Sequence, residues 1–325
     1  MKLTIAGTGK IAEEVLRMLH DDFQGKIEVT GIFAREKSIE HAIDLCQAFA
    51  PTGFVYTDYQ RMLLESDADF VYIANANHVH HRYAKEAMLA GKHVIVEKPI
   101  AVDRAETEDL IDTAISRCVY LLPAFSLLYM PLFRKLQELL PKLGKIRMIH
   151  CNFAQRSSRY DRYLAGELTP VFDPSMAGGT LSDLNVYNLC FTIALMGPPR
   201  TVRYDCNRGY NGIDTSGTLL CHYPTCLAVL SASKDSDGLS FGCIQGEEGY
   251  IEVHGSVSIL DSFTIHLRGQ EPETYRSETG THRLAYEFRE FLALAENRQE
   301  CHIVIPYFTR IVQEIAIAQE RMITS

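Results

Sequence analysis

The chain has 325 residues, of which 46% are hydrophobic and 22% charged, a composition typical of a soluble globular protein. This length predicts two domains rather than one. The net charge is −9, and the 32 basic residues form no block or stripe, so we expect no nucleic-acid partner. Dinucleotides stay possible ligands, because backbone N–H groups hold them as much as charged side chains do.

The nine cysteines are scattered without C-x-x-C pairs. An odd number in a chain of this size favours reduced thiols in the cytoplasm over disulfides. The first apolar run is too short for a signal peptide, and no apolar stretch is long enough to cross a bilayer. We therefore expect a cytoplasmic protein with no membrane partner.

The first part of the chain alternates strand and helix patterns, which is typical of a doubly wound α/β domain with a parallel sheet. Short apolar runs predict strands at Leu3–Ala6, Ile27–Phe33, Phe54–Tyr56, Phe70–Ala74, His93–Val96 and Val119–Leu122. Amphipathic patterns predict helices from Ile11 onward and at Ile39–Ala50, Val79–Ala90 and Arg104–Ser116.

A glycine-rich turn, Gly7-x-Gly9-x-x-Ala12, joins the first strand to the first helix. Its glycines permit a tight turn and the close approach of a pyrophosphate to the helix N-terminus, where N–H groups and the helix dipole favour an anion. The strand–turn–helix context favours a dinucleotide site over a tight turn with no ligand. The residues expected to bind there are Gly7, Thr8, Gly9, Lys10 and Ile11.

The end of the second strand bears on which dinucleotide binds. A carboxylate at this position would bind the ribose hydroxyls, but the chain has Ala34 followed by Arg35. A guanidinium suits a 2′-phosphate, so we expect Ala34 and Arg35 to contact the cofactor and NADP(H) to be favoured, with NAD(H) possible. Glu36 leaves NAD(H) open as the alternative, because its carboxylate would bind the ribose hydroxyls if the loop curls.

Polar side chains follow the fourth and fifth strands, at the sheet edge where open α/β sheets bind ligands. After the fourth strand come Asn75, Asn77 and His80, which we expect near the nicotinamide ribose; Asn77 also suits a helix N-cap. Three histidines lie in this segment, but no nearby carboxylate completes a ligand set, so we expect no metal. After the fifth strand come Glu97 and Lys98, which are either a surface salt pair or part of a site.

From about Gly144 the pattern changes to longer, alternating strands separated by hairpin-like breaks. They predict an α+β domain with a large, mostly antiparallel open sheet. Its expected strands are Ile146–Phe153, Thr201–Asn207, Thr215–Tyr223, Cys226–Ser233, Leu239–Gln245, Tyr250–His254 and Ser262–Leu267, and its expected helices Leu181–Met196, His282–Glu296 and Tyr307–Met322. The domains are thus expected at 1–122 (dinucleotide binding) and 123–325 (substrate binding).

A second motif, Gly178-Gly179-x-Leu181-x-Asp183, opens the expected helix at Leu181. Asp183 and Tyr187 are one turn apart and share a helix face. They either form a structural hydrogen bond or point at a substrate, with the tyrosine as proton carrier. A nearby ammonium such as that of Lys98 lowers the pKa of a phenol from about 10, which favours the second reading.

The chain resembles the Gfo/Idh/MocA oxidoreductase family over almost its whole length. The resemblance rests on Gly7-x-Gly9-x-x-Ala12, Asn77-x-x-His80, Gly91 to Pro99, Gly178 to Tyr187 and Gly246-x-x-Gly249. It implies an N-terminal Rossmann domain and a C-terminal α/β domain whose open sheet often forms an oligomer interface, so we expect a homodimer or homotetramer. It also implies NAD(P)-linked oxidation or reduction of a sugar, polyol, diol or related carbonyl.

By this resemblance Lys98 is the family's catalytic lysine, and Asp183 matches the acidic residue of its second motif. Tyr187 stands where many members have a histidine, which is similar to the glucose–fructose oxidoreductase and dihydrodiol dehydrogenase branch. Asn185 replaces a usual glycine and Ala76 a common proline. These departures bear on the substrate more than on the chemistry.

The sequence therefore predicts a dehydrogenase or reductase that acts on a carbohydrate-like small molecule, with Lys98, Tyr187 and Asp183 as catalytic residues. Glu97 is expected to hold Lys98 or the nicotinamide ribose. The alternative is a regulator of the same fold that binds NAD(P) without turnover, and a further one is a different nucleotide in the first domain.

Overall fold

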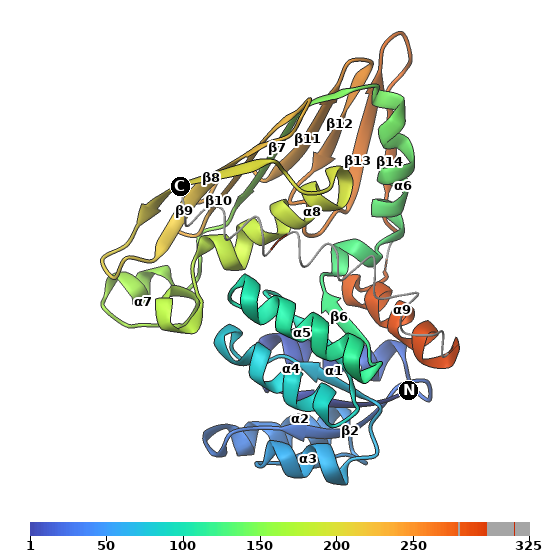
Figure 1. The fold of residues 1–325 in the computed structure, drawn as a ribbon, viewed down its shortest axis with the longest axis vertical. Helices are drawn as coiled ribbons and strands as arrows, with labels where there is room; N and C mark the ends of the chain where they lie inside the picture. The colour runs from blue at the N-terminus through green and yellow to red at the C-terminus, as the bar shows by residue number, and fades with distance from the viewer. Residues whose placement is uncertain (279, 298–314, 316–325) are drawn as a thin grey trace. The chain divides into compact units, whose positions relative to one another are not determined.

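A computed structural model describes residues 1–278, 280–297 and 315 of the chain (Figure 1). Apart from Ile315, the expected helix Tyr307–Met322 lies outside these residues. The described chain forms two compact units, one of residues 1–124 with 282–297 and the other of residues 125–281, without 279, together with Ile315. The expected division after residue 122 placed everything beyond it in the second domain, whereas the helix that follows residue 282 belongs to the first unit.

The first unit is built on a parallel sheet in the order β3-β2-β1-β4-β5-β6. Its strands are β1 (Lys2–Ala6), β2 (Glu28–Phe33), β3 (Phe54–Tyr56), β4 (Phe70–Ile73), β5 (His93–Glu97) and β6 (Leu121–Ala124). Its α-helices are α1 (Lys10–Asp22), α2 (Ile39–Phe49), α3 (Tyr59–Glu65), α4 (His80–Leu89), α5 (Arg104–Arg117) and α9 (Arg283–Asn297). The doubly wound architecture predicted from the sequence is confirmed, and α3 is an addition to it.

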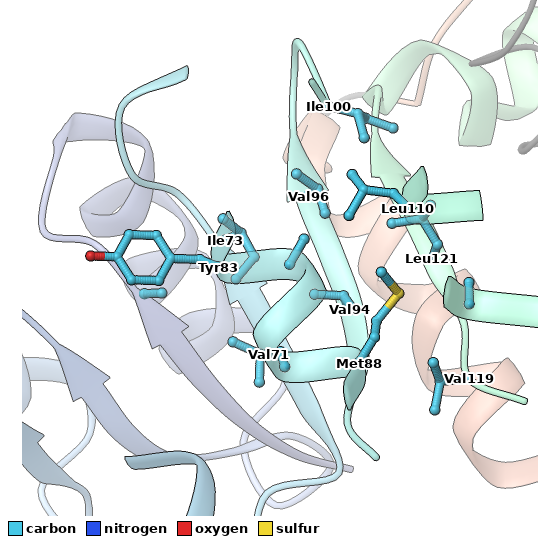
Figure 2. Packing of buried hydrophobic residues seen from close by; sticks show 14 of the residues in the cluster. Val71, Ile73, Tyr83, Met88, Val94, Val96, Ile100, Leu110, Val119 and Leu121 are labelled. Carbon is cyan, nitrogen blue, oxygen red and sulfur yellow. The ribbon is translucent and has the colours of Figure 1, made fainter. Parts of the chain in front are cut away.

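Apolar side chains fix this sheet to its helices. All four residues of β4 are buried, as expected for a strand covered on both faces. Figure 2 shows one cluster in which Val71, Val94 and Leu121 of three neighbouring strands pack with Met88 of α4 and Leu110 of α5. Burying a side chain of this size stabilises a fold by about 1.5–3 kcal/mol, so the strand ends beside the cluster are held firmly.

The strand order places the sequence motifs at one edge. Strand β1 is central, with β2 on one side and β4 on the other, so the chain connections leave it in opposite directions. Such a switch point opens a crevice at the carboxyl ends of the strands. Gly7 follows β1, Ala34 follows β2 and Asn75 closely follows β4, so all three meet at this crevice.

The second unit carries an eight-stranded sheet in the order β14-β13-β12-β11-β7-β10-β9-β8. Its neighbours are antiparallel except β7 and β10, which run parallel. The strands are β7 (Ile146–Ala154), β8 (Thr201–Arg208), β9 (Asp214–His222), β10 (Leu227–Ser233), β11 (Phe241–Gly246), β12 (Gly249–His254), β13 (Ser262–Leu267) and β14 (Glu273–Arg276). The helices are α6 (Pro131–Leu139), α7 (Tyr160–Leu164) and α8 (Val186–Met196), of which α8 contacts β7 and β10.

Two further observations concern the environment of the chain. The eight cysteines within the described residues carry free thiols, and five of them are buried. Within the same residues, every helix is too short or too polar to cross a membrane. The cytoplasmic location stays a prediction.

Candidate functional site

A pocket of about 220 Å³ lies in the first unit at the ends of β1, β2 and β4. Among the residues predicted to bind a cofactor, six line it. They are Gly7, Thr8, Gly9, Ala34, Arg35 and Asn75. The other lining residues are Phe33, Ser38, Ala74, Ala76, His78, Val79, Arg82 and Tyr83. The predicted residues Lys10, Ile11, Asn77, His80, Glu97 and Lys98 are outside this set.

The glycine turn leaves the floor of the pocket to backbone atoms. Gly7 has φ +130°, and a Cβ on it would lie 2.6 Å from the Ala74 carbonyl oxygen and 2.8 Å from Asn75 Oδ1. Gly9 is the N-cap of α1 and supplies no side-chain cap, so the first N–H groups of that helix are left for another acceptor. This cradle fits the pyrophosphate of a dinucleotide, which needs close backbone approach and a helix N-terminus.

The wall that follows β2 presents a guanidinium and a hydroxyl to the pocket. Arg35 is exposed and lines the pocket together with Ser38, whereas the exposed Glu36 does not line it. Arg82 of α4 adds a second guanidinium on the same pocket, with its Cζ 4.5 Å from the centre of the Tyr83 ring. Two cations and a hydroxyl suit a phosphate better than a ribose hydroxyl pair.

His80 has a structural position beside the pocket. It is fully buried, with Nδ1 2.7 Å from the Pro99 carbonyl oxygen and Nε2 2.9 Å from the Asn75 carbonyl oxygen. Burial lowers the pKa of its imidazole below the ordinary value of 6.5. The ring thus ties the segment after β4 to the segment after β5. The Nε2 atom of its neighbour His81 lies 2.6 Å from Asp109 Oδ2. The described part of the chain holds no cluster of potential metal ligands.

Glu97 and Lys98 form the end of β5. Glu97 is 8% exposed; the Tyr72 hydroxyl donates to its Oε1 at 2.5 Å, and the Lys98 backbone N–H donates to its Oε2 at 3.2 Å. Burial raises the pKa of this carboxyl. Glu97 therefore contacts the backbone of Lys98. Lys98 itself is half-buried and lies at the carboxyl edge of the sheet.

In the second unit, Asp183 and Tyr187 lie on the partly open side of one helical segment. Residues 181–185 form a π-helical turn that leads into α8, where the sequence predicted a single α-helix. The residues from 184 to 186 and from 188 to 193 are buried, whereas Asp183 and Tyr187 are half-buried, so the two side chains share the accessible face. The Tyr187 ring packs edge-on against Phe125, with centroids 5.9 Å apart.

Asp214 fixes the start of this segment, and the sequence analysis missed it. Its carboxylate accepts the Leu181 backbone N–H at 2.7 Å and the Tyr204 hydroxyl at 2.6 Å. Gly179 makes this approach possible, because it has φ +107° and any Cβ on it would clash with Asp214 Oδ1. Burial raises the pKa of Asp214.

The segment is also bound to β10. The Asn185 amide donates to the Leu230 carbonyl at 2.9 Å, and the Asn188 amide donates to the Ser231 carbonyl at 2.9 Å. Asn185, the departure noted in the motif, is thus a structural residue that holds the helix to the sheet. Directly after β10, the Lys234 ammonium forms an ion pair with Asp183. The only sequence signal for Lys234 is a lysine directly after a strand, a weak one.

The predicted site residues therefore fall into two groups. The pocket residues with Glu97 and Lys98 belong to the first unit, and Asp183 with Tyr187 belongs to the second. In the first unit the structure brings six of the predicted residues to one pocket, and in the second it places Asp183 and Tyr187 on one partly accessible helical segment. The convergence of Lys98 with Asp183 and Tyr187 stays a prediction.

Comparison with known proteins matches both units to one family. Residues 1–125 match a model described as "Oxidoreductase family, NAD-binding Rossmann fold", and residues 133–257 match one described as "GFO/IDH/MocA C-terminal domain". The uncharacterized oxidoreductase YgjR of Escherichia coli is 30% identical, over 93% of this chain and 90% of that protein.

Two further relatives are informative. The NADP⁺-dependent scyllo-inositol 2-dehydrogenase IolU of Bacillus subtilis is 32% identical, over 92% of this chain and 90% of that protein. A solved levoglucosan dehydrogenase, in complex with NADH and levoglucosan, superimposes with a TM-score of 0.85 at 16% identity, over 100% of this chain and 96% of that chain. At this identity the structural likeness speaks for the fold alone.

Proposed function

Because this chain belongs to the Gfo/Idh/MocA family of NAD-binding oxidoreductases, we propose that it moves a hydride between a nicotinamide dinucleotide and a carbohydrate-like alcohol or carbonyl. The observation that carries the proposal is the pocket at the β1/β4 switch point, with the Glu97–Lys98 pair at the end of the neighbouring strand. Family membership supports the enzyme over the non-catalytic regulator, and nothing in the described parts of the two units favours the regulator.

The cofactor is NADP(H) in preference to NAD(H). Arg35, Ser38 and Arg82 line the pocket, while Glu36, the residue suited to ribose hydroxyls, does not. The relative IolU is named as an NADP⁺ enzyme, which agrees with this choice. When bound, the dinucleotide supplies or accepts the hydride. The chain holds its phosphates with the backbone of Gly7 to Gly9 and the N-terminus of α1.

Side chains of this protein stabilise the charge that develops on the substrate oxygen and transfer its proton. The Lys98 ammonium polarises the substrate carbonyl, or stabilises the alkoxide formed from an alcohol, as a fixed cation. The Tyr187 hydroxyl gives or takes the proton on that oxygen, and Asp183 on the same helix face orients the substrate hydroxyls or the phenol. Glu97 holds the Lys98 backbone through its Oε2.

The substrate is a polyhydroxylated ring or chain, such as a sugar, inositol or diol. The name of one relative supports this class, since IolU is a scyllo-inositol 2-dehydrogenase. The half-buried carboxylate and phenol of the second unit are groups that hydrogen-bond to hydroxyls.

A panel assay tests the function. The purified protein is incubated with NADP⁺ or NAD⁺ and a set of sugars, inositols and diols, and the reduced nicotinamide is followed by absorbance. We expect turnover with at least one member of the panel, faster with NADP⁺. Lys98→Met is expected to lower kcat/KM by about 10²–10³-fold, because it removes the cation that stabilises the developing charge.

Two controls make this result decisive. Lys85→Met removes a lysine that pairs with Asp109 on the first unit, and it should leave turnover unchanged. NADP⁺ binding, measured by titration, should persist in Lys98→Met, since Lys98 does not line the pocket. Confirmed NADP⁺ binding with silence across the whole panel would favour the regulator, and near-normal turnover by Lys98→Met would remove its assigned role.

We also propose that the chain assembles as a homodimer or homotetramer through the sheet of the second unit. Strands β10, β11 and β12 alternate between fully buried residues and accessible ones, so one face of this sheet is partly open. The mass of the purified protein by light scattering tests this, and a monomer at assay concentration would contradict it.

A further inference from the structure

Lys234 is a buried lysine at the end of a strand. Its side chain is 3% exposed, and it directly follows β10. The backbone around it is fixed, because its N–H donates to the Thr215 carbonyl at 2.8 Å and its carbonyl accepts the Ser157 N–H at 2.8 Å. An ammonium taken out of water costs several kcal/mol unless it is paired, so its surroundings must supply negative charge.

The pairing partner is a residue of the candidate site. The Lys234 ammonium donates to Asp183 Oδ2 and lies 5.4 Å from the centre of the Phe172 ring. Its charge also acts on the nearby Asp214, the carboxylate that caps the π-helical turn. The lysine therefore pairs with one acid of the π-helical turn, Asp183, and acts electrostatically on Asp214, the acid that caps this turn.

The two members of the pair differ in what they can reach. The Asp183 side chain is 30% exposed to solvent, whereas the Lys234 side chain is almost completely buried. A substrate can therefore contact Asp183 but not the ammonium behind it. A salt bridge between a buried cation and a half-exposed anion holds the anion in one orientation while leaving part of it open.

We propose that Lys234 is a positioning residue that holds Asp183 as an ionised, oriented carboxylate on the face it shares with Tyr187. This inference rests on the proposed function, because it assumes that Asp183 acts on the substrate. Lys234 does not touch the substrate and acts only through Asp183. Small displacements of a catalytic group lower rates by about 10²-fold, so loss of the anchor is felt in turnover.

A double-mutant cycle on activity tests the proposal. Lys234→Met is expected to lower kcat/KM by about 10–100-fold, mostly in kcat, with NADP⁺ affinity unchanged because the pocket is in the other unit. In an Asp183→Asn background the same substitution should cost about 3-fold or less, since there is no carboxylate left to position. Lys234→Arg keeps the charge and should retain more activity than Lys234→Met.

Additive losses in the cycle would overturn the proposal, because they would mean that Lys234 acts independently of Asp183. A Lys234→Met protein with wild-type kcat would overturn it as well. Lys85→Met serves as the matched control, since Lys85 also pairs with an aspartate but belongs to the first unit, whereas Asp183 belongs to the second. If Lys234→Met does not fold, the same cycle is run with Lys234→Gln and Lys234→Arg.

Thermal unfolding of the wild type, Lys234→Met, Asp183→Asn and the double variant tests the ion pair without any substrate. Each single substitution should lower the Tm, and the double variant should lose less than the sum of the two, because the pair is already broken. Independent effects on Tm would overturn the pair itself. A wild-type protein that turns over nothing, but shows the coupling in Tm, would defeat the proposed function and leave the Lys234–Asp183 anchor standing.

Discussion

Arg35 is the residue through which the first unit is expected to choose its dinucleotide. It follows Ala34, which carries no carboxylate for the ribose hydroxyls, and it lines the pocket with an exposed guanidinium. A charge-assisted hydrogen bond contributes about 1.5–3 kcal/mol, which corresponds to about 10–100-fold in affinity. A 2′-phosphate can form this contact as an ion pair with the guanidinium, whereas a ribose hydroxyl carries no charge to pair.

We therefore expect Arg35→Ala to weaken NADP⁺ binding by about 10–100-fold while changing NAD⁺ binding by less than about 3-fold. Calorimetric titration of both dinucleotides measures the two affinities. Arg61→Ala is the matched control, because Arg61 is exposed on α3 and pairs with Glu65 away from the pocket. Equal losses for both dinucleotides would show that Arg35 contacts a part of the cofactor that they share.

The pocket residues of the first unit could be predicted from the sequence, whereas the residues that hold Asp183 in the second unit could not. Gly7, Gly9, Ala34 and Arg35 sit next to strand ends, so local pattern alone brings them to one edge. Lys234 contacts Asp183 across 51 residues of chain, and no local pattern reports that contact. Asp214 escaped notice for the same reason, because it contacts Leu181 across 33 residues of chain.

At the scale of the element, the turn that begins α8 depends on a glycine. Gly179 lies next to Asp214, and its φ of +107° is one that other residues rarely adopt. The π-helical form of residues 181–185 was not predicted, because the carboxylate that caps it comes from β9. Short or exposed elements were missed as well: α3 has seven residues, and β14 has four that are mostly exposed.

Gly179→Ala is expected to lower stability by more than the usual cost of a side chain at positive φ. The added Cβ would push Asp214 away from the Leu181 N–H, which removes the cap as well as straining the backbone by about 1–3 kcal/mol. Gly166→Ala is the control, since Gly166 has φ +87° but open space around it. Urea unfolding compares the two, and equal losses would mean that the space beside Asp214 is unimportant.

At the scale of the whole molecule, buried acids make stability depend on pH. Glu287 of α9 is fully buried, and neither carboxyl oxygen has a hydrogen-bond partner within the described structure. Burial first, and the nearby Glu97 second, raise the pKa of Glu287 well above 4.5, while Arg283 opposes the shift and Glu14 adds to it. The folded protein therefore holds this proton more tightly than the unfolded chain does.

A raised carboxyl pKa stabilises the fold below the unfolded value, and this contribution is lost as pH rises towards the folded value. The free energy of unfolding should therefore fall with rising pH above about 4.5 more steeply in the wild type than in Glu287→Gln, which has no proton to lose. Urea unfolding at several pH values measures both slopes. Glu138→Gln, at an exposed glutamate, is the control. Parallel curves for wild type and Glu287→Gln would contradict the shift.

The overall architecture could be predicted because each sheet has a distinct sequence pattern. Short apolar strands alternate with amphipathic helices in the first unit, and longer strands of alternating residues follow one another in the second. The family assignment and the two-sheet fold are confirmed, and the strands of the first unit lie within two residues of their expected bounds. The membership of α9 could not be read in the same way, because an amphipathic pattern shows that a helix has an apolar face but not which core receives it.

That membership of α9 means that the nucleotide-binding half is not encoded by a continuous stretch of chain. Phe288 sits against Phe23 and Tyr72, with ring centroids 6.5 and 5.7 Å away. A fragment that stops at residue 124 would leave those rings bare and its interior incomplete. A protein engineer who wants this half alone must therefore graft the late helix back on.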